Sequence, residues 1–203
     1  MRPKAQAGQT RKRAPNPPNG TSELDSGPAV DEEMIHEAEQ ILRVLHDLVP
    51  TDAFALCAWD GTGPGDRHLT LVDDGYPREV IAHINDEFVA TNPAYQMLYR
   101  QAPPPLRWRE MDREWGIRFT ETRTAAEFLL PSGYKEGTTV CLRQPDGRYT
   151  GSFHASWESP RTATDRRMTT IEQFRPLLAA ACDLLRAPRF VARAISGDGA
   201  AVA

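Results

Sequence analysis

The sequence predicts a single α/β domain in which an antiparallel sheet is covered by helices on both faces. The expected elements follow the order helix, two strands, several helices, two strands, helix. Glycine-containing turns at Asp60–Gly65 and Pro145–Gly147 join the strands of each pair, so each pair is expected to form a hairpin. Helices at both ends and in the middle of this order can cover both faces of one sheet.

The first elements are marked by helical spacing and a hairpin. Asp31 can cap a helix whose apolar residues recur every three or four positions from Ile35 to Val49, and Pro50 ends it. Strands are expected over residues 53–59 and 68–72.

The middle of the chain predicts short helices. Pro77 suits the first turn of a helix with an apolar face from Val80 to Val89, and Asn92-Pro93 ends it. A second short helix covers Tyr95–Tyr99. We expect a short strand or loop at 106–109, solvated loop charges at Asp112–Glu114, and a short helix over 120–130.

The last elements are a second hairpin and a long helix. Strands are expected over residues 138–144 and 148–157. Thr164 or Asp165 caps a helix that runs to about residue 186 and should bend at Pro176.

Both ends of the chain have the composition of tails. Residues 1–30, rich in proline, glycine and charge, are expected to be disordered. Residues 31–188 should form the domain, and residues 189–203 a flexible tail.

Composition excludes several function classes. The chain has 203 residues, of which 40% are hydrophobic and 26% charged, as in globular domains. It shows neither an apolar run of about 18 residues nor an apolar signal core, so we expect a cytoplasmic protein without membrane contact. The cysteines, Cys57, Cys141 and Cys182, are spaced as buried free thiols, and we expect no metal and no cofactor.

The charged residues are distributed unevenly along the chain. Residues 1–16 carry five basic residues and no acid, which leaves 19 basic against 28 acidic residues in the remainder. Duplex DNA binding needs clustered lysine and arginine, so we expect no direct DNA binding.

The stretch Gly147–Trp157 raises the question of catalysis, because His154 lies between two serines. Strand alternation predicts that Thr150, Ser152, His154 and Ser156 share one face, with the odd-numbered residues on the other. Residues i and i+2 lie roughly 6–7 Å apart, too far for a Ser–His bond without bending. We therefore expect no catalytic residue. His154 is either a pocket contact or a structural histidine with protein partners, with catalysis as the third alternative.

Residues 33–188 resemble the autoinducer-binding sensor domain of LuxR-type transcriptional regulators, a variant of the GAF/PAS-like α/β/α sandwich. The resemblance rests on Tyr76-Pro77, Asn92-Pro93 and Trp108, then on Glu127–Gly133 and on Asp146-Gly147 with Gly151. The residues of these motifs look closest to those of actinobacterial sensor domains, and the high arginine content agrees with such a source. The resemblance implies a sheet of about five strands.

The resemblance also implies a ligand pocket. Val80 and Ile84 stand where lactone-binding members have Trp and Tyr, and Asn92 stands in place of an Asp. We therefore expect a small, mostly apolar molecule other than an acyl-homoserine lactone. Only fifteen residues follow Pro188, so no helix-turn-helix DNA-binding domain is expected. The expected ligand-binding residues are Tyr76, Val80, Ile84, Asn92, Tyr99, Trp108, Trp115, His154 and Ser156.

Three functional hypotheses follow. The first is a sensor module that is not an enzyme and controls transcription or signalling through a protein partner, either a second copy or a LuxR-type regulator. The second is a ligand-free interaction protein that docks on a full-length regulator, with Val80, Ile84 and Phe88 packed directly against the sheet. The third is an enzyme that uses His154.

Overall fold

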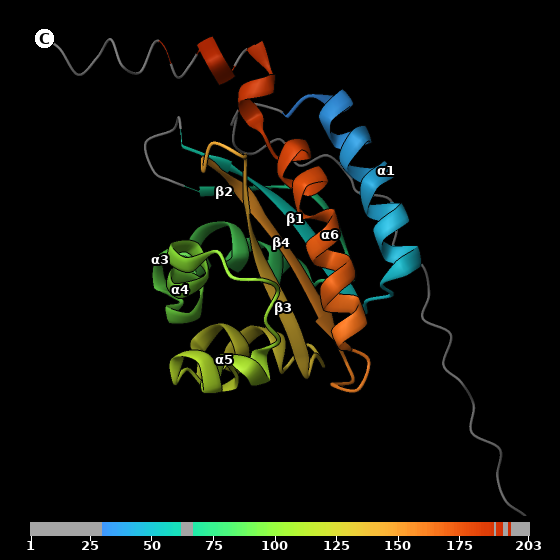
Figure 1. Ribbon diagram of the computed structural model, residues 1–203. Helices are drawn as coiled ribbons and strands as arrows, with labels where there is room; N and C mark the ends of the chain where they lie inside the picture. Colours follow the sequence, from blue (N-terminus) through green and yellow to red (C-terminus); the bar gives the residue numbers. More distant parts are fainter. Residues whose placement is uncertain (1–29, 62–66, 189, 193–194, 196–203) are drawn as a thin grey trace, which may run out of the picture.

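The computed structural model describes residues 30–61, 67–188, 190–192 and 195. Residues 1–29, most of the expected tail over 189–203 and most of the 60–65 turn lie outside these residues, whereas Phe190 is buried in the core. The described chain forms a sheet with helices on both faces, which confirms the predicted fold class (Figure 1).

The sheet has four strands in the order β2-β1-β4-β3, with every neighbouring pair antiparallel. β1 and β2 form one hairpin and β3 and β4 the other, and β1 pairs with β4 to join them. The strands are β1 (Ala53–Asp60), β2 (Arg67–Asp74), β3 (Glu136–Arg143) and β4 (Tyr149–Trp157).

The expectation of about five strands is wrong by one. The segment around Trp108 gives a single bridge, Arg107 to Thr138, and then begins α5 (Trp108–Trp115). The reason is local, because the Glu110 carboxylate accepts the Arg107 backbone N–H at 2.9 Å and closes a capping box. Asp112–Glu114, expected in a loop, are therefore exposed residues of a helix.

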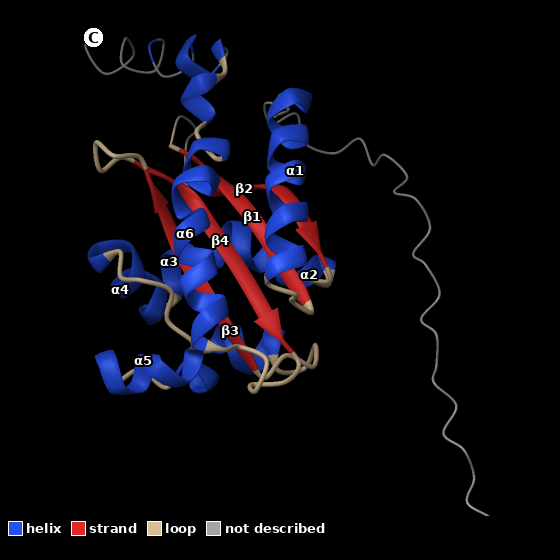
Figure 2. Cartoon of the chain, turned by 45° about the vertical axis from the view of Figure 1, so that its right-hand side comes forward, coloured by secondary structure: helices blue, strands red, loops and turns tan. Residues whose placement is uncertain are grey.

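Two long helices cover one face of the sheet (Figure 2). They are α1 (Glu32–Leu48) and α6 (Asp165–Ala181), and their apolar residues share one core with Leu56, Phe153 and Trp157. The helix expected to reach residue 186 ends earlier, because Asp183 caps a separate 3-10 turn, η4 (Leu184–Arg186).

Short helical segments cover the other face and form a second core with it. A helix with a π-helical turn in its middle comes first, followed by α4, α5 and two more short segments. The remaining bounds are α2 (Arg78–His83), η1 (Ile84–Phe88, π), α3 (Val89–Thr91), α4 (Pro93–Gln101), η2 (Phe119–Glu121, 3-10) and η3 (Thr124–Leu129, π).

Strand alternation reverses at Gly151. The Thr150 hydroxyl donates to Ala179 of α6 at 3.0 Å, whereas Tyr149 lies in the second core. The sequence placed these two side chains on the opposite faces, and that prediction is wrong. The β3–β4 register shifts beside this point, and such a bulge reverses the alternation. A Cβ at Gly151 would lie 2.0 Å from the Cys57 carbonyl oxygen, so the close approach requires glycine.

Cys57, Cys141 and Cys182 are buried, as predicted. Within the described residues, no helix is long and apolar enough to cross a membrane, and no group of three or more histidine, cysteine or acidic side chains could hold a metal ion.

Candidate ligand-binding site between the sheet and the short helices

Ser152, His154 and Ser156 lie along β4 on the face that the short helices cover, and all three are buried. The Thr139 hydroxyl of β3 lies 3.1 Å from Nδ1 of His154, and the Ser152 hydroxyl lies 2.8 Å from Nε2. The prediction that Ser152 and His154 lie too far apart to bond is wrong, because the imidazole extends along the strand toward the serine.

His154 is held in its neutral form. Burial, together with the nearby His68 imidazole, lowers its pKa to about 3. A histidine of this kind is a weak base at neutral pH. Both ring nitrogens contact hydroxyl groups, so the Ser152–His154 pair has no carboxylate to orient it as in a catalytic triad.

Tyr76 reaches the same strand from the segment before α2. Its hydroxyl and that of Ser156 lie 2.7 Å apart and share a hydrogen bond. Burial raises the pKa of Tyr76, so the phenol stays protonated. The Tyr134 ring packs edge-on to Tyr76 at 5.3 Å, and its hydroxyl donates to the Gly75 carbonyl at 2.7 Å. The ring is thereby fixed against the sheet.

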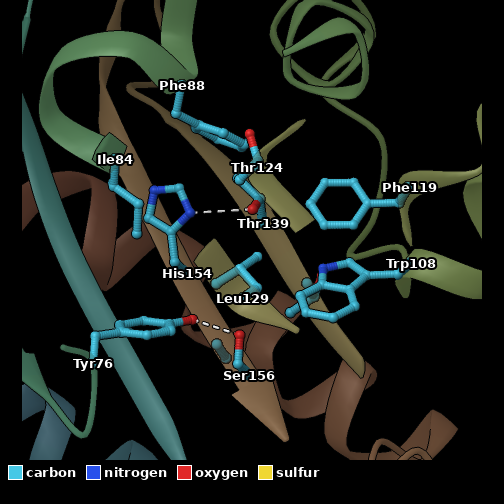
Figure 3. Close-up of a pocket in the computed structure, with 12 residues that line it drawn as sticks. Tyr76, Ile84, Phe88, Trp108, Phe119, Thr124, Leu129, Thr139, His154 and Ser156 are labelled. Carbon is cyan, nitrogen blue, oxygen red and sulfur yellow. Dashed lines mark hydrogen bonds between the residues drawn. The ribbon is translucent and has the colours of Figure 1, made fainter. Parts of the chain in front are cut away.

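A cavity of about 20 Å³ lies among these side chains, enough for one water molecule. Hydroxyl groups and His154 line its sheet side, and apolar side chains project from the helices (Figure 3). The full lining is Tyr76, Ile84, Phe88, Trp108, Phe119, Thr124, Leu129, Thr138, Thr139, His154, Ala155 and Ser156.

Part of the expected site meets at this cavity. Its lining includes five of the residues named from the sequence, which are Tyr76, Ile84, Trp108, His154 and Ser156.

The other four lie elsewhere. Val80 is buried in the same core, away from the cavity. Asn92 caps α4, accepting the Ala94 N–H at 2.9 Å, and its amide donates to Thr124 at 2.9 Å. Tyr99 is 38% exposed, and the half-buried Trp115 donates to Gln101 at 3.0 Å.

Sequence reasoning missed Thr138, Thr139 and the apolar residues after position 118. Alternation along β3 could have indicated Thr139, since it lies two residues before the buried Cys141 on the same face. Phe119 and Leu129 sit in short 3-10 and π segments, for which the sequence has no periodic signal.

The helix side of the cavity is built on the two π-helical turns. η1 supplies Ile84 and Phe88, and η3 supplies Thr124 and Leu129. A π turn holds one residue more than an α turn and is frequent at functional sites.

The chain matches no family model, and no curated protein matches its sequence. Solved structures do match. A domain assigned to a two-component sensor histidine kinase of Sinorhizobium meliloti 1021 gives a TM-score of 0.55 at 15% identity, over 78% of this chain and 95% of that one. The GAF domain of a Bacillus halodurans sensor histidine kinase gives 0.52 at 13% identity, over 76% and 95%. The VqsR LBD domain of Pseudomonas aeruginosa gives 0.51 at 16% identity, over 75% and 88%. The chain has a GAF-like fold.

Proposed function

We propose that residues 31–188 form a small-molecule sensor module, similar to the ligand domain of LuxR-type regulators, that controls transcription or signalling through a protein partner. One observation carries this proposal: buried hydroxyl groups and the neutral His154 converge on a cavity between the sheet and the short helices. The likeness to the VqsR LBD domain supports it as an analogy of fold.

The lining indicates the ligand class. None of the twelve lining residues carries a charge at neutral pH, since burial keeps His154 neutral. A charged ligand would lose its hydration without gaining a partner there. We therefore propose a neutral, mostly apolar molecule whose polar edge hydrogen-bonds to the hydroxyls of β3 and β4.

A ligand larger than water requires the cavity to open. The sheet side is fixed by strand pairing, whereas Ile84, Phe88 and Leu129 stand on π turns, which can convert to α turns with a one-residue shift. We propose that the ligand binds by displacing these turns, and that their movement changes the surface that the partner contacts.

The closed cavity favours a second candidate. Val80, Ile84 and Phe88 are at most 4% exposed and pack in the core against the sheet, as expected of a ligand-free interaction protein. In that case the chain docks on a full-length regulator without a ligand. In either case we propose a cytoplasmic protein that pairs with a second copy or a regulator, without enzymatic activity at His154 and without binding DNA itself.

A thermal-shift screen with neutral, mostly apolar compounds tests the sensor proposal. A ligand should raise the melting temperature of the wild-type protein. His154→Leu should weaken its binding by roughly tenfold, because the Thr139 and Ser152 hydroxyls lose the imidazole that orients them, while the exposed control His36→Leu should not. Complete absence of stabilising compounds, together with a regulator complex formed by ligand-free protein, would establish the second candidate instead.

A further inference from the structure

Another open space beside α4 lies outside the central cavity. A groove of about 300 Å³ is lined by Trp59, Val89, Ala90, Tyr95, Gln96 and Tyr99, which we call the aromatic groove. Its volume is in the range of small-molecule sites, whereas the central cavity holds about 20 Å³.

Three aromatic rings form the walls of the groove, and contacts behind them hold each in place. The Tyr95 hydroxyl lies 2.7 Å from that of Tyr149. The Arg143 guanidinium lies 4.8 Å from the centre of the Tyr99 ring and donates to the Tyr99 carbonyl at 2.6 Å. Trp59 packs edge-on against His68 at 5.4 Å. Since these partners fix the rings, the groove does not have to collapse on itself, and a ligand meets walls that are already ordered.

The groove is separate from the central cavity. Phe88 stands between the two, with its ring 5.2 Å from Tyr95 and 5.5 Å from His154. A second recess, of about 340 Å³, shares Trp59 and Tyr99 with the groove but contains Asp60 and the Arg148–Asp183 ion pair. The aromatic groove itself has no charged residue among the six that line it.

We propose that the aromatic groove binds a neutral, planar aromatic molecule between Trp59 and the Tyr95–Tyr99 pair. The rings of Tyr95 and Tyr99 lie 27° apart with 6.3 Å between their centres, and Tyr99 is 38% exposed, so a flat ring can contact Tyr99 from the groove. A flat ring gains offset or edge contacts with such walls, which a saturated ring of the same size does not. An ionised molecule would find no charged partner in the lining.

The four tryptophans make the proposal testable by position. Trp59 lines the groove, Trp108 lines the central cavity, and Trp157 lies buried under α1 and α6. We would titrate unlabelled indole, a neutral planar probe, into the ¹⁵N-labelled chain and follow the four indole N–H signals, each assigned with a Trp→Phe variant.

The Trp59 signal should shift and saturate, while the Trp108 and Trp157 signals stay in place. Tyr99→Ala should weaken binding by about fivefold or more through lost ring contacts. Leu130→Ala serves as the control, since Leu130 has the same 38% exposure as Tyr99 and lies outside the groove. Ala90→Leu, at an exposed lining position, should block the groove without unfolding the chain.

Three results would overturn the proposal: no saturable shift at Trp59, equal affinity in Tyr99→Ala and wild type, or tighter binding of indole-3-acetate than of indole. A saturable shift at Trp108 alone would also overturn it, and would place the ligand in the central cavity. Failure here is therefore distinguishable from failure of the sensor proposal.

Discussion

The Trp108 indole lies directly over Gly137 of β3, so closely that a Cβ on residue 137 would stand 2.5 Å from its Cζ2 atom. The same ring stacks on Phe119 with 4.8 Å between the ring centres. Gly137 thus lets α5 approach the edge of the sheet and bring Trp108 to the cavity.

Gly137→Ala should displace Trp108 and lower the free energy of unfolding by about 1–3 kcal/mol. Urea denaturation measures the loss, and the assigned indole N–H signal of Trp108 reports the displacement. In a Trp108→Leu background the same substitution should cost at least about 1 kcal/mol less. Equal costs in both backgrounds would show that Trp108 does not set the requirement for glycine.

The Tyr76–Ser156 hydrogen bond gives a second prediction. Ser156→Ala leaves a buried phenol without its partner and should cost about 1–3 kcal/mol of unfolding free energy. Adding Tyr76→Phe removes the unpaired hydroxyl and should recover part of that loss. This pairing would be contradicted if the double variant lost as much unfolding free energy as the two single variants together.

The buried imidazoles predict acid sensitivity. The pKa of His68 and the pKa of His154 are both lowered by burial to about 3, against roughly 6.5 in the unfolded chain. The folded state therefore binds fewer protons below about pH 6.5, so its stability falls as the pH drops from there toward about 3. Each histidine contributes up to about 1.4 kcal/mol per pH unit within that window.

Urea denaturation across this window measures the slope. His154→Gln keeps a polar side chain between Ser152 and Thr139 and should make the slope shallower by about 1 kcal/mol per pH unit. His36→Gln, at an exposed histidine, is the matched control and should leave the slope unchanged. An unchanged slope in His154→Gln would contradict a neutral buried His154.

Two arginines at the start of α5 tie it to neighbouring elements, Arg107 to the start of α6 and Arg109 to β3. Arg107 pairs with Asp165 at 2.6 Å, and Arg109 pairs with the buried Glu136 at 2.5 Å. Arg109→Met leaves the Glu136 carboxylate without its cation and should cost about 2–3 kcal/mol of unfolding free energy. Arg113→Met, on the same helix, removes only an exposed pair with Glu114 and should cost less than about 0.5 kcal/mol. Similar losses in the two variants would contradict the role of the buried pair.

Prediction from the sequence succeeded where the signal was periodic or chemical. The hairpin turns and the apolar stripes of α1 and α6 predicted the layers, and burial of the β4 polar face followed from the helices expected over it. Three details were predicted wrongly because they have no periodic signal in the sequence. The capping box at Arg107 starts a helix where a fifth strand was expected, and a bulge reverses the alternation at Gly151. The direction of the His154 side chain allows its bond to Ser152.

Only some of the residues expected in one pocket line the cavity, again because the sequence pattern does not show side-chain directions. Helical spacing places Val80 and Ile84 on one face of the helix, but it does not show that the π turn brings only Ile84 to the cavity. Asn92-Pro93 ends the preceding helix, as predicted, but Asn92, which was expected in the pocket, serves as the cap of α4. Tyr99 follows at the far end of that helix and reaches the aromatic groove.

The central proposal, a ligand bound between the sheet and the short helices, is tested most directly by the Trp108 indole N–H signal in the presence of a compound that raises the melting temperature. The account predicts that such a compound shifts this signal in the wild-type protein, and that His154→Leu requires about tenfold more of it for the same shift. A stabilising compound that leaves Trp108 unmoved would contradict the account, as would one that acts equally on wild type and His154→Leu.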